Sequence, residues 1–428
     1  MPTWIVTHSK DLCNFLIPLL VGFSPAQLRH ALNFVEALLV CTAKHKTLAA
    51  LTRLLQTEHA DPFALADFFR VSPWSGEQVR QAVTGFVLQT VATLQAQTGW
   101  RLLFLSLDDS LCCKDVATHK LQAVSLHFDH VRQRRQKGQY TNASKYIGLH
   151  LQLGPVQFLL TWRPYYKRNQ VKTLNRQRRA QGGPPLAYHS LPDLARQMLA
   201  EIAPHLPAAG RVYVLFDAWY AGTDLFKFIR QHGWHWICAS KSNRWLDHYK
   251  LAEWWWHLGH QPIERITLRS SKGSHTYSTR HRVGRLRRYP DPVLAVLSKR
   301  NRRDVRPAYF LSSDTRLSVR CLLKYYAYRW QAEVDNFYVK ERLGLADYRL
   351  QSVEAILNWH ALVFAAYVFL QYRRVVLLLT QPQTPLQPVG DVLRDHQTGH
   401  ARQTVHHIAT LARSGYTPAE LVAMFCPT

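Results

Sequence analysis

The chain of 428 residues is long enough to bury a large core and to form two or three structural units. Its 54 Lys and Arg residues against 28 Asp and Glu residues give a formal net charge of +26, an excess that indicates a polyanionic partner, with nucleic acid the default. Seven cysteines without a CxxC pair argue against a zinc site and for a reduced, cytoplasmic protein, and no strongly amphipathic basic helix or lipidation signal is predicted that would support a membrane-surface role.

The first hundred residues are predicted to be all-helical. Apolar residues recur at helical spacing over residues 28–40, 48–55 and 79–94. This region is nearly neutral, with seven Lys and Arg residues against six acids, so the positive charge lies further along the chain. Residues 47–55 and 62–69 could form a helix-turn-helix-like unit that reads DNA, but a packing or dimerisation domain fits the charge equally well.

The first candidate site residues follow a predicted buried strand at residues 101–108. The strand ends in Asp108, Asp109 and Ser110. A buried strand that delivers carboxylates at its end is a common way to present a metal site, although Asp and Ser are also ordinary residues of a surface turn. Because side chains alternate across a strand, only one of Asp108 and Asp109 can point into a given site. The strand alone leaves the choice between them open.

The next region is strongly basic, because no Asp or Glu occurs between residues 130 and 192. A solvated basic face normally contains acids as well, so this composition indicates a track for phosphates. Residues 146–153 and 156–162 are predicted to form a hairpin, residues 176–185 a polar loop and residues 191–202 a helix. The Lys and Arg residues of the region are at positions 132, 134, 135, 137, 145, 163, 167, 168, 172, 176, 178 and 179.

A second predicted strand, at residues 211–217, also runs into an acid, Asp217. A helix at residues 223–231 follows it. A lone Asp between a strand and a helix also occurs in nucleotide-binding folds, but no P-loop or GxGxxG motif accompanies it here. Asp217 is therefore a second candidate metal ligand.

Another strand is predicted at residues 234–239, and the polar segment after it contains Lys241 and Arg244, which are candidate DNA contacts. Short alternating segments then predict a β-rich insertion within residues 245–312. Thirteen Lys and Arg residues against two acids between residues 265 and 306 give this insertion a second basic surface. Its tryptophan cluster is more often core than a platform for an unpaired base.

Residues 318–345 are predicted to form one long helix, because apolar residues recur at helical spacing and no Pro or Gly occurs before Gly344. Four residues with chemistry suited to phosphodiesters lie on one stripe of it, within about 60° of one another. They are Tyr326, Arg329, Glu333 and Lys340. This stripe lies beside the apolar residues Leu322, Trp330 and Phe337, and the opposite face is expected to be solvated. That face carries Lys324, Gln331, Asp335 and Arg342.

The remaining chain is predicted to contain a largely apolar helix at residues 353–379 and a polar, loosely attached segment at residues 380–415. Residues 417–420 form a capping box with Pro at the first helical position, which predicts a short final helix.

The spacing Tyr326-x2-Arg329-x3-Glu333-x6-Lys340 matches the YREK signature of DDE transposases from bacterial insertion sequences. The chain resembles this family over roughly residues 100–375. In the family the first acid is followed two places later by Ser or Thr, which favours Asp108 over Asp109.

The resemblance implies a fold of the α/β class, in which a ribonuclease H-like mixed sheet is flanked by helices. The family places the first two acids on strands and the Glu on a late helix, with a β-rich insertion between them. The expected N-terminal helical domain, for DNA binding or dimerisation, spans residues 1–100. The catalytic core is expected in two parts, residues 101–244 and 313–379, on either side of the insertion at residues 245–312. A polar tail with a short helix follows at residues 380–428.

The resemblance also implies the chemistry. Asp108, Asp217 and Glu333 would hold two Mg²⁺ ions, for which Mn²⁺ can substitute. Tyr326, Arg329 and Lys340 would hold DNA phosphates. The implied function is cleavage at the ends of a mobile element and joining of the 3′-hydroxyls to target DNA.

The implied partners are double-stranded DNA, as terminal inverted repeats and as target, and a second copy of the chain on that DNA. The implied location is the bacterial cytoplasm, associated with the nucleoid. The alternatives are a metal-dependent nuclease or resolvase of the same fold, and a non-catalytic, domesticated DNA-binding protein.

Overall fold

The computed structural model of the chain describes residues 7–55, 62–115, 117–118, 120–129, 139–180, 182–206, 210–270, 273–300, 306–381 and 383–425. Parts of both predicted basic surfaces lie outside these residues, namely Arg132, Arg134, Arg135, Lys137, Lys272, Arg302 and Arg303.

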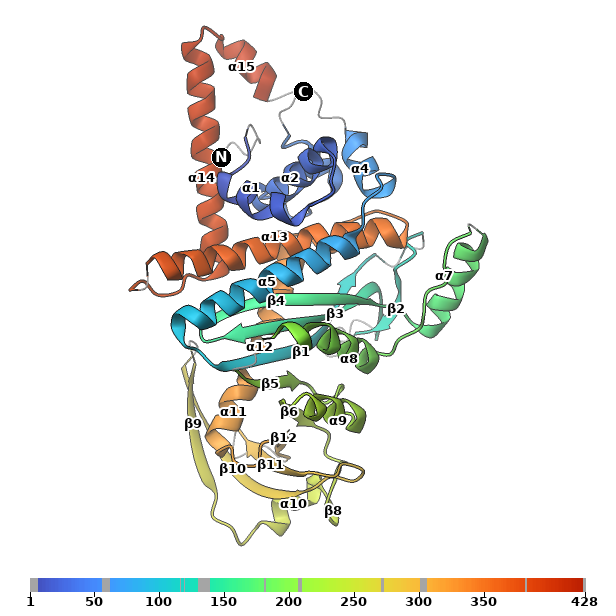
Figure 1. The fold of residues 1–428 in the computed structure, drawn as a ribbon, viewed down its shortest axis with the longest axis vertical. Coiled ribbons are helices and arrows are strands. Elements are labelled where there is room, and N and C mark those ends of the chain that lie inside the picture. The colour runs from blue at the N-terminus through green and yellow to red at the C-terminus, as the bar shows by residue number, and fades with distance from the viewer. Residues whose placement is uncertain are drawn as a thin grey trace.

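A ten-stranded mixed sheet runs through the molecule in the order β2-β3-β1-β5-β6-β12-β11-β10-β9, and β4 pairs with β3 (Figure 1). In its central part, β1, β5 and β6 are parallel to one another, whereas β3 is antiparallel to both of its neighbours, β1 and β4. This arrangement, with helices on both faces, confirms the predicted ribonuclease H-like α/β class. The strands are β1 (Leu102–Cys113), β2 (Ser125–Phe128), β3 (Tyr140–Leu153), β4 (Val156–Tyr165), β5 (Arg211–Phe216), β6 (His235–Ser240), β9 (Glu264–Ser270), β10 (Gly273–Arg285), β11 (Pro292–Lys299) and β12 (Ala308–Ser312).

The β-rich segment after β6 continues the central sheet. Strands β9 to β12 lie where short alternating segments were predicted, and β12 pairs antiparallel with β6, with Tyr309 opposite Ser240. Pairing with β12 removes the open edge that β6 would otherwise present to solvent. A hairpin of β7 (Trp245–Leu246) and β8 (Tyr249–Lys250) and the helix α10 (Leu251–His257) lie beside it. Trp254 and Trp255 of α10 are buried, whereas Trp256 is exposed.

Helices cover both faces of the parallel strands, as buried parallel strands require. The helix α9 (Thr223–Gln231) packs on one face, where the Phe226 ring stacks on Trp236 at 3.9 Å. The helix α11 (Val319–Ala327) packs on the other face, where Tyr325 contacts the rings of Phe104 and Tyr213.

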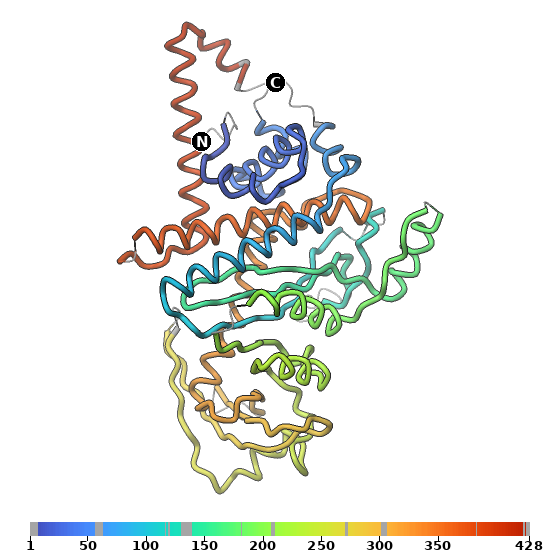
Figure 2. The backbone as a smooth tube through the Cα atoms, in the orientation of Figure 1, coloured from blue at the N-terminus to red at the C-terminus, as the bar shows by residue number. Residues whose placement is uncertain are grey.

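The N-terminal helices form a layer against the long apolar helix α13 (Val353–Thr380), as Figures 1 and 2 show. The Phe34 ring lies 4.8 Å from Trp359, and Phe15 lies 5.5 Å from Phe369. Although α13 is long and apolar enough to cross a membrane, most of its apolar stretch is covered by protein, which is typical of a core helix. The layer contains α1 (Lys10–Leu16), α2 (Pro25–Val40), α3 (Leu48–Thr52), α4 (Pro62–Arg70) and α5 (Gly76–Thr98).

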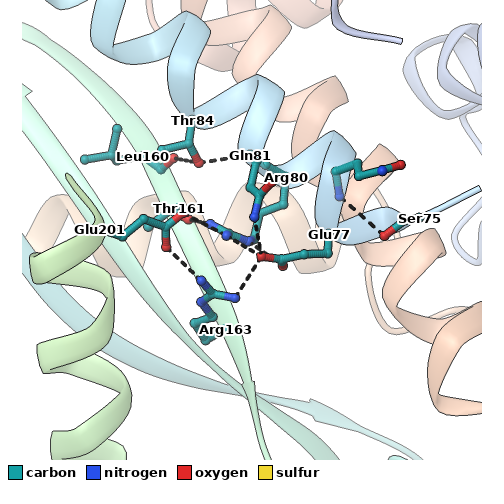
Figure 3. A network of polar contacts seen from close by, with 10 residues as sticks. Ser75, Glu77, Arg80, Gln81, Thr84, Leu160, Thr161, Arg163 and Glu201 are labelled. Atoms are coloured by element: carbon teal, nitrogen blue, oxygen red, sulfur yellow. Dashed lines mark hydrogen bonds and ion pairs between the residues drawn. The ribbon is translucent and has the colours of Figure 1, made fainter. Parts of the chain in front are cut away.

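A buried arginine ties α5 to the sheet and to the helix α8 (Leu191–Ile202), as Figure 3 shows. The Arg80 guanidinium lies 2.6 Å from a Glu77 oxygen and 2.8 Å from a Glu201 oxygen, and it also bonds the hydroxyl of Thr161 on β4. Arg163 pairs with both glutamates. Two carboxylates compensate two guanidinium groups, so the charge of Arg80 can be buried at this junction.

The prediction of one long helix over residues 318–345 is wrong. The segment forms α11, a separate helix α12 (Trp330–Phe337) and a π-helical turn (Tyr338–Arg342). Between α11 and α12 the amide of Gln331 donates to the carbonyl of Tyr328, a bond of the tighter 3₁₀ type that changes the rotation per residue.

This break reverses part of the predicted burial. Asp335, predicted to be solvated, is only 1% exposed. Trp330 and Phe337, predicted to face the core, are 54% and 46% exposed. A carboxylate oxygen of Asp335 lies 2.6 Å from His150 Nδ1, and the other accepts from the Tyr367 hydroxyl at 2.6 Å. These partners make the burial of its charge tolerable.

Two further predictions are corrected. The helix α7 (Arg168–Ala180) occupies the first half of the predicted polar loop at residues 176–185, and it is a basic amphipathic helix, which no part of the sequence was expected to form.

The helix α14 (Val389–Arg413) occupies most of the predicted loose segment at residues 380–415. The helix is held in place although it has few apolar residues. These residues pack on other helices, and His396 pairs at 2.7 Å with the fully buried Glu36 of α2. The final helix, α15 (Pro418–Phe425), begins at the predicted capping box, in which Thr417 and Glu420 bond each other's backbone amides.

Replacing Asp335 with alanine should destabilise the protein by about 3–5 kcal/mol, because His150 and Tyr367 would be left buried without their partner. Urea unfolding followed by circular dichroism measures this loss. The matched control is Asp67→Ala, which breaks an exposed pair with Arg70 and should cost less than about 1 kcal/mol. Equal losses in the two variants would contradict the assignment.

Candidate active site

Asp108 and Asp217 lie level on neighbouring strands. The parallel pairing of β1 with β5 runs from Leu102 opposite Arg211 to Ser106 opposite Leu215. Continuing the same register by two residues brings Asp108 opposite Asp217, directly after the end of β5. Neighbouring strands are about 4.8 Å apart, and residues in register point to the same face of a sheet. The register therefore aligns Asp108 with Asp217 on neighbouring strands, with Asp217 one residue past the end of β5.

The face in question is the one that carries α11. Asp108 alternates with Ser106 and Phe104, and Phe104 contacts Tyr325 of α11. Asp217 alternates with Leu215 and Tyr213, whose ring also contacts Tyr325.

Asp109 lies on the opposite face. One of its carboxylate oxygens accepts from the Tyr220 hydroxyl at 2.8 Å, and the other lies 2.7 Å from Lys145 Nζ. These two adjacent acids thus have different surroundings, and the register aligns Asp108 with Asp217.

The Glu333 carboxylate reaches Asp108 through one guanidinium group. Arg329 Nη1 lies 3.1 Å from Asp108 Oδ1, and Arg329 Nη2 lies 2.7 Å from Glu333 Oε1. The second oxygen of Asp108 accepts from Asn336 Nδ2 at 3.0 Å. Burial raises the pKa of Asp108 to about 7, against the opposing effect of the Arg329 charge, and the nearby carboxylates of Asp109 and Glu333 raise it further.

The position of α12 is set by residues beside the site. The Asn336 side-chain oxygen accepts from the Tyr146 hydroxyl of β3 at 2.7 Å, while its nitrogen donates to Asp108. Asp335 fastens the same helix to β3 and α13 through His150 and Tyr367. Sequence reasoning missed Asn336, although its spacing of three and seven residues from Glu333 and Arg329 puts it on their stripe.

The other two residues of the predicted stripe also lie near the site. Tyr326 packs on Phe310, and the Arg329 guanidinium carbon is 5.9 Å from the centre of its ring. Burial raises the pKa of Tyr326 to about 12. Lys340 Nζ donates to the carbonyl oxygen of Leu111 at 3.4 Å, three residues beyond Asp108 on β1.

The two candidate DNA contacts after β6 differ in their surroundings. Lys241 is exposed, with its ammonium 5.5 Å from the ring centre of Trp219. Trp219 is itself 61% exposed and comes two residues after Asp217. Arg244 instead donates to the carbonyl oxygen of Ala221 and lies over the Phe226 ring, so it braces the turn that follows Asp217.

The donor set suits a hard cation, because Asp108, Asp217 and Glu333 offer only carboxylate oxygens. Within the described residues no three acidic, histidine or cysteine side chains are gathered closely enough to hold a metal ion as they stand. The Arg329 guanidinium bridges two of the three carboxylates and occupies the charge-compensating position. The carboxylate oxygens suit a divalent ion in their chemistry, and they would be free to bind one if Arg329 moved aside.

The chain matches a family model described as DDE superfamily endonuclease over residues 18–289. The match covers more than half of the chain, which therefore belongs to the DDE superfamily endonucleases. The family acts on DNA and generally uses divalent metal ions such as Mg²⁺. The matched segment contains Asp108 and Asp217 and ends before Glu333. A search of curated proteins found no match.

The raised pKa of Asp108 predicts a pH-dependent stability in the metal-free protein. Between the ordinary pKa of 3.8 and the folded value of about 7, the unfolded chain has lost this proton while the folded protein retains it. Stability contributed by the protonated carboxyl is therefore lost as the pH rises through this window. Asp108→Asn cannot titrate there, so its unfolding temperature relative to wild type should rise from pH 4 to about pH 7.

Differential scanning fluorimetry with a chelator at constant ionic strength measures this difference. Asp224→Asn, at an exposed position of α9, serves as the control and should give a profile parallel to wild type. A pH-independent difference between Asp108→Asn and wild type would refute the assigned shift.

Proposed function

We propose that this protein is a DNA transposase of the YREK branch, which cleaves the ends of an insertion sequence and joins the 3′-hydroxyls to target DNA. The observation that carries the proposal is the Arg329 bridge between Asp108 and Glu333, with Asp217 level with Asp108 on the same face. Family membership supports DNA cleavage, and the complete signature around Glu333 supports the branch.

In this proposal Asp108, Asp217 and Glu333 hold Mg²⁺, or Mn²⁺ in its place. When bound, such ions supply an activated water or 3′-hydroxyl and stabilise the leaving oxygen of an in-line displacement. Arg329 compensates the charges of Asp108 and Glu333, and its guanidinium fork would suit a DNA phosphate once released from them. Asn336 holds the Asp108 carboxylate in orientation throughout.

The remaining candidate residues bind the DNA backbone or position the residues that do. Lys340 reaches the end of β1 beside the site, and the Tyr326 ring packs beside the Arg329 guanidinium. Lys241 supplies an exposed cation near Asp217, and Arg244 shapes the turn between them. The substrates are the terminal inverted repeats and a target duplex, engaged by two copies of the chain in the bacterial cytoplasm. The helices of residues 1–100 serve DNA binding or dimerisation.

A nuclease or resolvase of the same fold is the second candidate, favoured by the endonuclease description of the family. A strand-transfer assay separates the two functions, with duplex ends taken from DNA that flanks the coding sequence. A transposase yields joined products with a supercoiled target in Mg²⁺. Cleavage without joined product favours the nuclease, and DNA binding without either reaction would indicate the non-catalytic alternative.

Each of Asp108→Asn, Asp217→Asn and Glu333→Gln should lower Mg²⁺-dependent cleavage by at least about 10³-fold, because each removes a charge from the metal site. Gel-based cleavage assays measure the rates, and fluorescence anisotropy with a chelator should show DNA affinity within about threefold of wild type. Asp224→Asn is the matched control and should cleave normally. Normal cleavage by any of the three site variants would refute that residue's assignment.

DNA binding should weaken steeply with added salt, because the basic surfaces contact many phosphates. For six or more contacts, the logarithm of the association constant should fall against the logarithm of salt concentration with a slope steeper than about −5. Fluorescence anisotropy across a KCl series measures this slope. A flat response would contradict the role given to the positive charge.

A further inference from the structure

The helix α7 projects from the edge of the sheet near β2 and β4 (Figures 1 and 2). Its inner side is anchored through buried Gln170, Val171 and Leu174, and Gln170 Nε2 donates to the carbonyl oxygen of Gln122 at 3.0 Å. Near its end, Arg178 pairs with Glu354. Asn175 bonds the backbone of Leu186, and the other side of the helix is exposed to solvent.

A stripe of four cations runs along the outer side of α7. At about 100° per residue, their spacings of four, four and three place them within about 80° of one another. All four are exposed, and in the described part of the chain no carboxylate lies within salt-bridge distance of any of them. They are Arg168, Lys172, Arg176 and Arg179.

This stripe is unfavourable for an isolated helix. Its four cations form three pairs of like-charged neighbours at helical spacing, and each pair destabilises a helix by about 0.2–0.5 kcal/mol. An exposed helix is ordinarily stabilised by alternating charges, but α7 contains no acid. A polyanion along the stripe would remove the repulsion.

A second stripe, beside the cations, carries side chains that can read bases. Asn169, Thr173 and Gln177 follow one another at spacings of four and are exposed. Amide and hydroxyl side chains of this kind can bond the edges of bases in the major groove of DNA.

The helix begins two strands away from β1, the strand that carries Asp108. Arg168 comes three residues after Tyr165, which pairs in register with Lys145 of β3. Lys145 in turn pairs with Leu111 of β1 and holds Asp109, the neighbour of Asp108. Two strand spacings, about 10 Å, therefore separate the end of β4 from the strand of Asp108.

We propose that α7 lies in the major groove of the DNA duplex, with its cations on the phosphates and with Thr173 and Gln177 against base edges. The helix is about 20 Å long and fits a groove about 12 Å wide. A membrane surface fits worse, because Val171 and Leu174, the large apolar residues of α7, are already buried. Single-stranded DNA fits worse, because α7 has no aromatic residue for stacking. The assignment rests on the proposed function, for which it names the element that reads the duplex.

The phosphate contacts are tested with the full chain and a random-sequence duplex in chelator, which separates binding from cleavage. Arg176→Ala/Arg179→Ala should flatten the salt slope by about 1.8, the value expected for two lost phosphate contacts. Arg402→Ala/Arg413→Ala removes two exposed arginines from α14 and should leave the slope unchanged. Equal effects of the two double variants would overturn the proposal. So would an equal loss of affinity for single-stranded DNA or for anionic vesicles.

Base reading is tested by selection from a random duplex library. Thr173→Ala/Gln177→Ala should retain the wild-type salt slope but lose preference at specific positions, by a factor of about 5 to 150 per contact. Arg176→Lys/Arg179→Lys keeps the charge and should retain both slope and preference. An unchanged sequence preference in Thr173→Ala/Gln177→Ala would overturn the reading role. Absence of Mg²⁺-dependent cleavage by the wild-type chain would instead refute the proposed function without affecting these binding outcomes.

Discussion

One guanidinium group joins the two halves of the candidate site. Arg329 bonds Asp108 on the first strand and Glu333 one helical turn further along its own segment, residues that are 225 positions apart in the chain. Without this cation, a strand carboxylate in a largely buried position would face a second carboxylate with little water to screen them. The raised pKa of Asp108 shows that even this compensation is incomplete. The carboxylates of the site thus require a positive charge nearby, which Arg329 supplies in this structure and which a divalent cation could also supply.

The helix that carries Glu333 depends on residues outside the site. Asp335 and Asn336 fasten α12 to β3 and α13, and the Asn336 side chain extends this attachment to Asp108. Consecutive residues of one short helix therefore perform two tasks: one face holds the acid and its cation, and the other face anchors the helix in the core. Short helices have little stability of their own, so this tertiary anchoring determines where Glu333 lies.

The distribution of charge agrees with this organisation. The nearly neutral N-terminal helices pack with α13 into the apolar core, while cations are concentrated on the projecting helix α7 and on the strands of the extended sheet. In the strand order of the sheet, these cations lie towards both edges, on either side of the central strands β1 and β5.

Much of the site could be predicted from local sequence. Alternation and apolar runs predicted β1 and β5 with an acid at the end of each, and helical spacing predicted that Arg329 and Glu333 share a stripe. Tertiary contacts decided the rest. The break before α12 and the burial of Asp335 arise from partners on β3 and α13, and α14 is held by the buried Glu36 of a helix more than 350 residues earlier. Periodicity records only which residues share a face of an unbroken helix or strand, whereas the cost of a buried charge depends on partners that the fold brings together.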